Sequence, residues 1–497
     1  MRKVIDEQMR FGQIDISQIE IDPRCRDEIP QMLRGLQHIY CTPGIRKEVF
    51  KILEEEVVQN GVDISNGRPG MHLWQILVLG VLRVNCNSDW DRIHYLANQA
   101  KNLRQMLGLD GWLDETTFSL QSLKDNASLL KPETLEKINV LVIREGHKLV
   151  KKKEEEELRG RCDSFVLETN VHYPTDINLL LDAMRKVIFL VTVLAVRVGV
   201  PGWRKFSFNF KTIKGLFRTC QKMKHSTSKD ERKKEERESL IQEAFSQYLT
   251  VSEDFLKRAR ETVVKARSGG DNFVLEIAEI EGYMLHAERQ IDQIRRRVLN
   301  GETIRHDEKV FSIFEEHTEW ISKGKAGVPV ELGLRVCILE DQYGFILQHR
   351  VMEKEEDVDV AVPMVKNALV NFPELTGCSF DKGFWNPLNR EELEECLDHL
   401  VLPKKGKLSE SDKDREYSDE FRYYRRRHSA VESAVNAVEN HGLDRCPDHG
   451  IEGFRRYVSL AVLGRNIQQL GALFRKEELR KLKRKKSAKC GKLKNAA

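Results

Sequence analysis

The sequence predicts an α/β fold, in which a mixed sheet carries helices on its faces, follows an all-α amino-terminal domain and contains a large helical insertion. Three observations lead to this prediction. Residues 1–150 have helical apolar spacing, strand patterns begin only near residue 161, and helical periodicity returns over about 177–300 before the strands resume. A length of 497 residues corresponds to roughly three domains.

The composition excludes several classes of protein. Hydrophobic residues make up 40% of the chain and charged residues 32%, while Gly and Pro number only 31 and 13. This profile is typical of globular, helix-rich proteins and excludes collagen-like, mostly disordered and mucin-like chains. The longest apolar stretch, residues 187–196, ends at Arg197 and is too short to cross a bilayer. Ten cysteines without a CxxC pair, and no signal-peptide pattern after Met1, predict a cytoplasmic protein.

The net charge of +4 conceals a basic carboxyl-terminal tail, residues 475–497. Eleven Lys and Arg but only two Glu lie between residues 475 and 494. A basic tail on a near-neutral body predicts a polyanionic partner, although a purely solubilising extension would have the same composition.

The amino-terminal region, residues 1–150, has the pattern of several short helices. We expect helices at 28–40, 44–59, 72–84 and 89–98 and another beginning at Glu115, with a breaker at 67–70, Asn87 or Ser88 as the cap of the fourth helix and Asp114 as the cap of the fifth. The segment 72–84 is apolar nearly all round, which predicts a buried helix. Short helices joined by tight turns fit a helix-turn-helix DNA reader, and they fit a plain helical bundle at least as well.

Beyond a charged linker at residues 148–159, β-branched and aromatic residues indicate strands. We expect strands at 161–173, 309–314, 330–339, 345–352, 377–380 and 399–403, with the third and fourth forming a hairpin, and helices at 358–371, 390–397, 428–440 and 450–474. When the helical block 177–300 is set aside as an insertion, four strands precede alternating helices and strands. This order predicts a mixed sheet close to the ribonuclease H-like arrangement, within a domain at residues 151–474.

Three acidic residues lie where ordinary surface charges are not expected. Asp163 has the strand parity of apolar Phe165 and Leu167, and Asp381 ends a strand ahead of a turn-rich segment. Glu432 lies on the polar side of the helix 428–440, opposite its apolar stripe. A charge near a core is costly unless it is paired or bound to a metal, and ligands favour the strand ends of open α/β sheets.

Two aspartates and a glutamate that meet at one sheet edge would form an all-oxygen site for Mg²⁺ or Mn²⁺. Two such ions can activate an attacking oxygen and stabilise the leaving oxygen in an in-line phosphoryl displacement. The chain contains 78 Asp and Glu, however, so three can always be selected. Parity and turn signals alone therefore leave ordinary structural or surface acids as the alternative.

The segment 163–176 (DSFVLETNVHYPTD) resembles the first-aspartate block of DDE-type bacterial insertion-sequence transposases, with the ISNCY group as the nearest likeness. Later blocks of that family resemble residues 311–325, 380–385 and 425–446 in the same order, and the region around 67–69 is similar to the family's amino-terminal domain. The resemblance implies that Asp163, Asp381 and Glu432 hold two Mg²⁺ or Mn²⁺ ions. It also implies cleavage at transposon ends and joining of the 3′-hydroxyl ends to target DNA.

The same resemblance implies a homo-oligomer on paired terminal inverted repeats, associated with the nucleoid when bound to DNA and with no membrane partner.

One departure from the family's pattern concerns the residues around Glu432. Some related families place a Tyr, an Arg and a Lys at fixed steps around it, whereas here His428 precedes Glu432 by four positions and Glu439 follows it by seven. The hairpin-handling roles of that signature are therefore not carried over.

A basic and aromatic stretch, residues 203–225, contains seven Lys and Arg and no acid. Cations of this kind neutralise phosphates, and aromatic faces accept unstacked bases. An equally good interpretation of this stretch is a helix that packs its Phe residues against a core while its cations are only solvated. Trp385 likewise has two equally good interpretations: it stacks against an unpaired base, or it is an aromatic residue packed in a turn. We assign DNA contacts to Arg204, Lys205, Lys211, Lys214, Arg218, Trp385 and His428, and end-sequence recognition to the amino-terminal helices.

Three functions agree with these features. The first is a DDE transposase, an enzyme that cleaves and joins DNA with divalent metal. The second is a catalytically silent DNA-binding regulator derived from a transposase, and the third is a metal-dependent nuclease of the same fold. Retention of all three acids favours an enzyme over a silent regulator.

Overall fold

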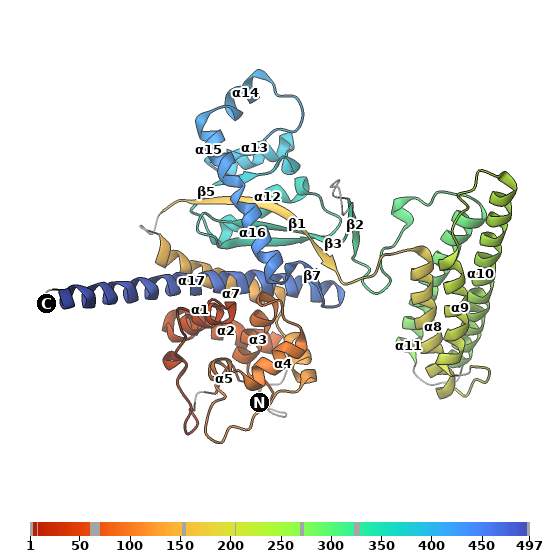
Figure 1. The fold of residues 1–497 in the computed structure, drawn as a ribbon, viewed down its shortest axis with the longest axis horizontal. Coiled ribbons are helices and arrows are strands. Elements are labelled where there is room, and N and C mark those ends of the chain that lie inside the picture. Colours follow the sequence, from red (N-terminus) through yellow and green to blue (C-terminus); the bar gives the residue numbers. More distant parts are fainter. Residues whose placement is uncertain are drawn as a thin grey trace. The chain divides into compact units, whose positions relative to one another are not determined.

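The computed structural model describes residues 3–6, 8–59, 70–151, 156–203, 205–268, 273–322 and 329–494. The chain forms two compact units (Figure 1). One unit combines residues 1–170 with residues 321–497, and the other contains residues 171–320. The first unit has the predicted α/β character, with a mixed sheet and many helices.

The sheet is built around the long strand β1 (Leu158–Thr169). Strands β3 (Val330–Glu340) and β4 (Ile346–Met352) form an antiparallel hairpin, and β3 pairs antiparallel with β1. On its other side β1 pairs in parallel with β5 (Leu375–Phe380), which pairs in parallel with β6 (His399–Val401). The main order is therefore β4-β3-β1-β5-β6. The short strands β2 (Glu319–Ser322) and β7 (Arg445–Cys446) lie beside β3 and β1.

Helices pack on both faces of this sheet (Figure 1). Cys162 and Leu339 face a core that includes α12 (Asp357–Asn371) and α13 (Pro387–Cys396). Phe165 and Val336 face the opposite core, which includes α16 (Ala430–Val438) and α17 (Gly450–Lys494). The period-two alternation of β1 therefore separates two cores.

The amino-terminal helices share the second core with the sheet, and α17 runs between the two (Figure 1). At the crossing of α1 and α17, glycines bring the two backbones into contact. A Cβ on Gly471 would lie 2.0 Å from the Gln31 carbonyl oxygen, and one on Gly35 would lie 2.3 Å from the Ile467 oxygen. The helices are α1 (Glu28–Cys41), α2 (Pro43–Gln59), α3 (Leu73–Asn85), α4 (Trp90–Gln99), α5 (Lys101–Met106), α6 (Leu120–Ala127) and α7 (Pro132–Val150).

Among the described residues of the second unit, four α-helices pack around one apolar core. They are α8 (Asp176–Arg197), α9 (Phe206–Lys222), α10 (Glu231–Ser268) and α11 (Val274–Ile294). Their apolar positions recur at helical spacing, which explains why the block 177–300 has helical periodicity in the sequence. Among the described helices of both units, none combines the length and apolarity needed to span a bilayer.

Two predicted helix caps are wrong. Helix α4 is capped by Asp89, whose Oδ1 accepts from the Arg92 N–H at 2.7 Å, and not by Asn87 or Ser88. Asp114 does not start a helix, because its carboxylate accepts from the Thr116 N–H at 2.9 Å within a turn. The next helix, α6, begins at Leu120 under a cap from Ser119. The predicted breaker at 67–70 lies, except for Gly70, outside the described residues.

Three expected elements also differ from the structure. Residues 309–314 form no strand, because the Ser312 hydroxyl accepts from the N–H groups of Phe314 and Glu315 and bends the chain. Strand β1 starts at Leu158 and ends at Thr169, so it is shifted relative to 161–173. The helix expected over 428–440 is interrupted at Ser429, which separates α15 (Asp419–His428) from α16.

Candidate active site

The three predicted acids lie on neighbouring elements of the sheet unit. Register pairs Cys162 of β1 with Phe380 of the parallel strand β5. The next residues along these two strands are Asp163 and Asp381, which therefore follow at the same level of the sheet. Asp381 directly follows β5 and is the N-cap residue of the short 3-10 helix η4 (Lys382–Phe384). Glu432 lies in the first turn of α16, which contacts β1.

A break in the pairing of β1 makes room beside Asp163. Strand β5 pairs with β1 only as far as Cys162, and β7 begins to pair at Glu168. Between these two points no described strand pairs with this edge of β1, and Asp163 lies at the start of the gap. In open α/β sheets a ligand site is expected beyond the carboxyl end of a strand such as β5. Phe165 and Leu167, which share the strand parity of Asp163, are buried in the core that includes α16 and α17.

Asp163 lies in a strongly negative environment. Burial, which is the largest cause, and the charges of Asp381, Asp357 and Glu432 together raise its pKa from 3.8 to about 6. The backbone N–H of Ser164, which donates to Asp163 Oδ1 at 2.8 Å, opposes this rise. The three acids selected from the sequence therefore lie within electrostatic reach of one another, although they are distant along the chain.

Within the described ranges, no Lys or Arg forms an ion pair with Asp163, Asp381, Glu432 or Asp357. Also within those ranges, no three His, Cys, Asp or Glu side chains are close enough together to hold one ion. The carboxylates thus share a common region without converging on one point, and Asp163 is half-buried whereas Asp381 and Glu432 are exposed. The donor set consists of hard oxygens, so its chemistry fits Mg²⁺ or Mn²⁺.

Asp357, the first residue of α12, is a fourth acid that the sequence did not single out. Its Oδ1 accepts a hydrogen bond from the Ser164 hydroxyl at 2.6 Å. Its Oδ2 lies against Gly383, where a Cβ would approach it to 2.8 Å. An acid in the first turn of a helix is common because it complements the helix dipole. The sequence therefore offered no signal that separates Asp357 from an ordinary helix start.

His428, the last residue of α15, lies beside the acids. Its Nδ1 and the Ser379 hydroxyl are 3.0 Å apart, which fixes the ring against β5. Burial lowers the pKa of His428, although Asp381 and Glu432 act in the opposite direction. The imidazole is therefore held in its neutral form near neutral pH, where it presents one donor and one acceptor.

Trp385, which follows η4, packs as a turn aromatic against the core on the α12 side of the sheet. Its ring is half-buried, and the Lys404 ammonium lies 5.9 Å from the ring centroid. This packing accounts for the residue without a stacked base. The predicted base contact of Trp385 stays a prediction.

The basic stretch of the second unit combines both interpretations of its sequence. Trp203 packs against Phe255 and donates to the Thr262 hydroxyl at 2.9 Å, and Phe217 is buried, so several aromatics are core residues. Phe208 is 53% exposed. Arg204 lies outside the described residues. The remaining predicted cations are exposed and, among the residues that the structure describes, form no ion pair: Lys205, Lys211, Lys214 and Arg218.

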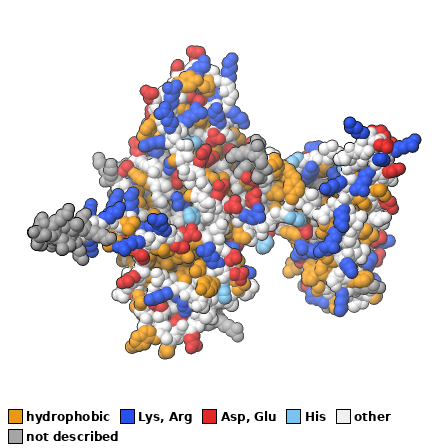
Figure 2. Space-filling model, in the orientation of Figure 1, with side chains coloured by type: hydrophobic (Ala, Val, Ile, Leu, Met, Phe, Trp, Pro, Cys, Tyr) orange, Lys and Arg blue, Asp and Glu red, His pale blue; other side chains and the backbone are white. Residues whose placement is uncertain are grey.

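Charge is unevenly distributed on the surface of the sheet unit. In Figure 2, Asp and Glu side chains gather over the part of this unit where β1 and α12 lie, whereas acids and cations are mixed over α14 (Glu410–Glu416) and α15.

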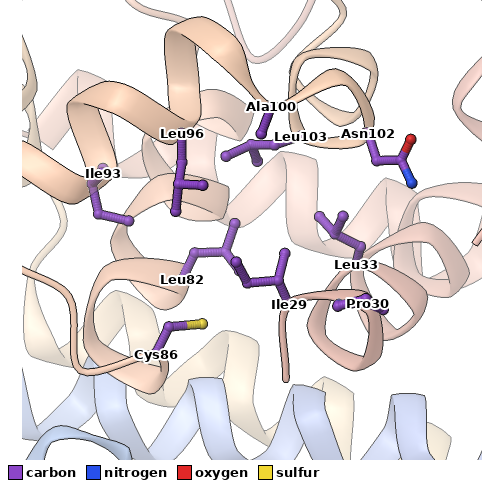
Figure 3. Close-up of a pocket in the computed structure, with 10 residues that line it drawn as sticks. All are labelled: Ile29, Pro30, Leu33, Leu82, Cys86, Ile93, Leu96, Ala100, Asn102 and Leu103. Atoms are coloured by element: carbon purple, nitrogen blue, oxygen red, sulfur yellow. The ribbon is translucent and has the colours of Figure 1, made fainter. Parts of the chain in front are cut away.

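A separate cavity of about 100 Å³ lies among the amino-terminal helices (Figure 3). The side chains that point into it come from α1, α3, α4 and α5 and are almost all apolar. Asn102 is polar, Cys86 contributes a buried thiol, and none of the described lining residues is Asp, Glu or His. A small, almost wholly apolar cavity of this kind is typical of imperfect packing in a helical core.

The chain matches no protein-family model, no curated protein and no solved structure. The chemistry of its site residues is therefore the basis for a function.

Proposed function

We propose that this protein is a transposase of the DDE type, which cleaves DNA at transposon ends and joins the 3′-hydroxyl ends to target DNA. The single observation that carries the proposal is the relationship of three acids. Asp163 and Asp381 occupy matching levels of two parallel strands, and Glu432 on α16 contributes to the same negative field. Within the described ranges no basic side chain neutralises them.

The sheet order supports a ribonuclease H-like domain. Three antiparallel strands, β4, β3 and β1, are followed by two parallel ones, β5 and β6, and the helix with the third acid comes after the last of them. Helices α8 to α11 come between β1 and β2, so the helical unit is an insertion in this domain. The strand order supports only the proposed fold, and the three acids support the proposed function.

The residues that would hold the two divalent ions are Asp163, Asp381 and Glu432. When bound, such ions supply activation of the attacking oxygen and stabilisation of the leaving oxygen in phosphoryl transfer. The chain itself orients the donors. The Ser164 N–H fixes Oδ1 of Asp163, and the Ser379 hydroxyl fixes the ring of His428 beside the acids.

The exposed cations of α9 are the proposed DNA contacts of the helical unit. Lys211, Lys214, Arg218 and Lys222 follow at steps of three and four residues, so they share one side of the helix. Four cations in a row suit a phosphate backbone, whose charges are regularly spaced.

Association of two DNA ends further requires more than one chain. We expect sedimentation with end DNA to show a homo-oligomer, and one chain per complex would contradict this.

Nicking of DNA that carries the genomic flanks of the coding region tests the function. With Mg²⁺, wild-type protein should cut at the flanks, and Asp163→Asn should abolish cutting while gel-shift binding survives. Asp398→Asn is the matched control, because Asp398 is exposed and lies between α13 and β6, outside the site. Nicking that persists in Asp163→Asn would contradict the assignment of the site.

The same assay separates the alternatives. Pre-cut ends with free 3′-hydroxyl groups should be joined to a target plasmid by a transposase. A nuclease of the same fold would cut without giving joined product. A silent DNA-binding regulator would bind the flanks and neither cut nor join them.

A further inference from the structure

A second cavity, of about 570 Å³, opens beside the carboxylates of the sheet unit. Its walls come from β1, β5, β6 and α15. None of the described lining residues is an acid, whereas three are arginines. The lining consists of Arg159, Gly160, Arg161, Gln342, Gly377, Cys378, Ser379, His399, Val401, Tyr424, Arg427 and Ala430.

The cavity lies on the same side of the sheet as Asp163. Side chains at alternate positions of a strand share a face, so Arg159, Arg161 and Asp163 form one row along β1. Ser379 lines the cavity and also contacts His428, which lies beside Asp381 and Glu432. The cavity is therefore linked to the carboxylate site through the contact between Ser379 and His428.

Local backbone features place Arg159 across the floor of the cavity. The pairing of β1 with β5 shifts register between Leu158 and Arg159, and such an irregularity redirects a side chain. Gly377 leaves the necessary space, because a Cβ there would lie 2.8 Å from Nη1 of Arg159. The guanidinium carbon of Arg159 is 5.1 Å from the ring centroid of Tyr424.

Both arginines have buried hydrogen-bond donors that no described residue accepts. Nη2 of Arg159 binds Glu157 at 2.7 Å, but its Nη1 is buried and has no partner among the residues that the structure describes. Nη2 of Arg161 binds Glu340 at 2.8 Å and the Asp341 carbonyl at 2.7 Å, and its Nε is likewise buried without a partner in the described part of the chain. A buried donor without an acceptor is costly, so a site that keeps two of them is suited to an anionic ligand.

We propose that this cavity binds one nucleotide of the DNA strand that enters the active site, with its phosphate on Arg159 and Arg161 and its base on the Tyr424 ring. The inference rests on the proposed function, since it places the strand beside the carboxylates. The volume is within the range of pockets that enclose small ligands. Arginine forks match phosphate oxygens, and a tyrosine face accepts any base.

Binding of a fluorescent 12-nucleotide single strand, measured by anisotropy in EDTA, tests the proposal without cleavage. Arg159→Gln and Tyr424→Leu should each weaken binding about tenfold. Tyr424→Phe keeps the ring and should bind within about twofold of wild type. Arg426→Gln removes the same charge from an exposed position of α15 outside the cavity lining and should also bind within about twofold.

Wild-type affinity in both Arg159→Gln and Tyr424→Leu would overturn the proposal. An equal loss in Tyr424→Phe or Arg426→Gln would overturn it too, since the effect would then not depend on the cavity's ring and donors. The slope of log affinity against log salt gives a second readout. Loss of one phosphate contact should lower this slope by about 0.7 in Arg159→Gln, and an unchanged slope would contradict the phosphate contact.

Titration with dTMP distinguishes a strand from a free nucleotide. If dTMP binds and requires Arg159 while strand binding does not, the cavity is a free-nucleotide site and the strand assignment is wrong. The nicking assay separates this proposal from the function. If wild type, Arg159→Gln and Tyr424→Leu all nick DNA equally well, the proposed role of the cavity is wrong and the proposed function stands. If strand binding depends on Arg159 but the protein never nicks DNA, the role of the cavity stands and the proposed enzymatic function is wrong.

Discussion

The Ser164 hydroxyl donates to Asp357 Oδ1 at 2.6 Å, which ties β1 to the start of α12 next to the predicted catalytic aspartate. The other oxygen of Asp357 lies against Gly383, two residues after Asp381. One carboxylate therefore contacts the chain beside both aspartates of the site. We expect the spacing of Asp163 and Asp381 to depend on this contact.

Gly383→Ala tests that dependence. The new Cβ would lie 2.8 Å from Asp357 Oδ2, closer than van der Waals contact permits, so Asp357 or the turn must move. We expect a fall in the nicking rate of at least about tenfold, because small misplacements of reacting groups are costly. Gly282→Ala, at a helical glycine with no heavy atom within 4 Å of the added Cβ, is the control. Wild-type nicking by Gly383→Ala would show that the contact does not position the site.

Asp163→Asn should make the metal-free protein more stable above pH 6. Burial and the neighbouring acids raise the pKa of Asp163 from 3.8 to about 6, so the folded state binds the proton more tightly than the unfolded state. The Asp163 carboxyl therefore makes its full contribution to the free energy of unfolding below about pH 3.8, and this contribution is lost as the pH rises through about 6. A tenfold difference in proton affinity corresponds to about 1.4 kcal/mol, and solvent screening reduces the total gain in stability to about 1–2 kcal/mol.

Urea denaturation in EDTA, at pH 4 and at pH 8, measures this effect. The wild-type protein and Asp163→Asn should have nearly equal free energies of unfolding at pH 4, and Asp163→Asn should be more stable than wild type at pH 8. If wild type and Asp163→Asn are equally stable at both pH values, the charged form of Asp163 does not destabilise the folded protein.

Gly471→Ala should destabilise the sheet unit. An added Cβ would lie 2.0 Å from the Gln31 carbonyl oxygen, and backbone atoms at a helix crossing cannot rotate away. Overpacking of this kind costs roughly 1–3 kcal/mol, which a lower urea midpoint would reveal. Gly44→Ala, where nothing lies within 4 Å of the Cβ, is the matched control. A midpoint equal to that of the control would contradict the close approach of α1 and α17.

Replacement of three α9 cations should change the salt dependence of DNA binding. Lys211, Lys214 and Arg218 are exposed on one side of the helix. Their joint change to Gln should lower the slope of log affinity against log salt by up to about 2.7 for duplex DNA, if each contacts one phosphate. The same change at Lys233, Lys257 and Lys265 of α10 removes equal charge from the bundle and should leave the slope near its wild-type value. Equal slopes in both triple variants would refute a DNA surface on α9.

Much of the sheet could be predicted from the sequence because its signals are local. The hairpin of β3 and β4 has two apolar strands around a short turn, in which Gly344 adopts φ 85°. Alternation along β1 places Asp163 on the same side as Phe165 and Leu167, both of which are buried. The positions of Asp381 and Glu432 follow from a strand end and a helix stripe.

Other features depend on contacts that a local pattern does not contain. The break between α15 and α16 occurs at Ser429, without Gly or Pro to mark it. The turn at Ser312 arises from a side-chain hydroxyl that displaces strand pairing. Asp357 belongs to the site only because α12 packs where Ser164 can reach it. The cavity beside the acids likewise depends on the register shift at Arg159 and on Gly377 of a distant strand.

The binding of Mn²⁺ by Asp163, Asp381 and Glu432 together is the central claim, and titration followed by electron paramagnetic resonance tests it most directly. We predict two ions per chain in the wild-type protein and the loss of at least one in each of Asp163→Asn, Asp381→Asn and Glu432→Gln. Asp398→Asn should retain both ions. A wild-type protein that binds no Mn²⁺, or three site variants that bind it as wild type does, would contradict the account.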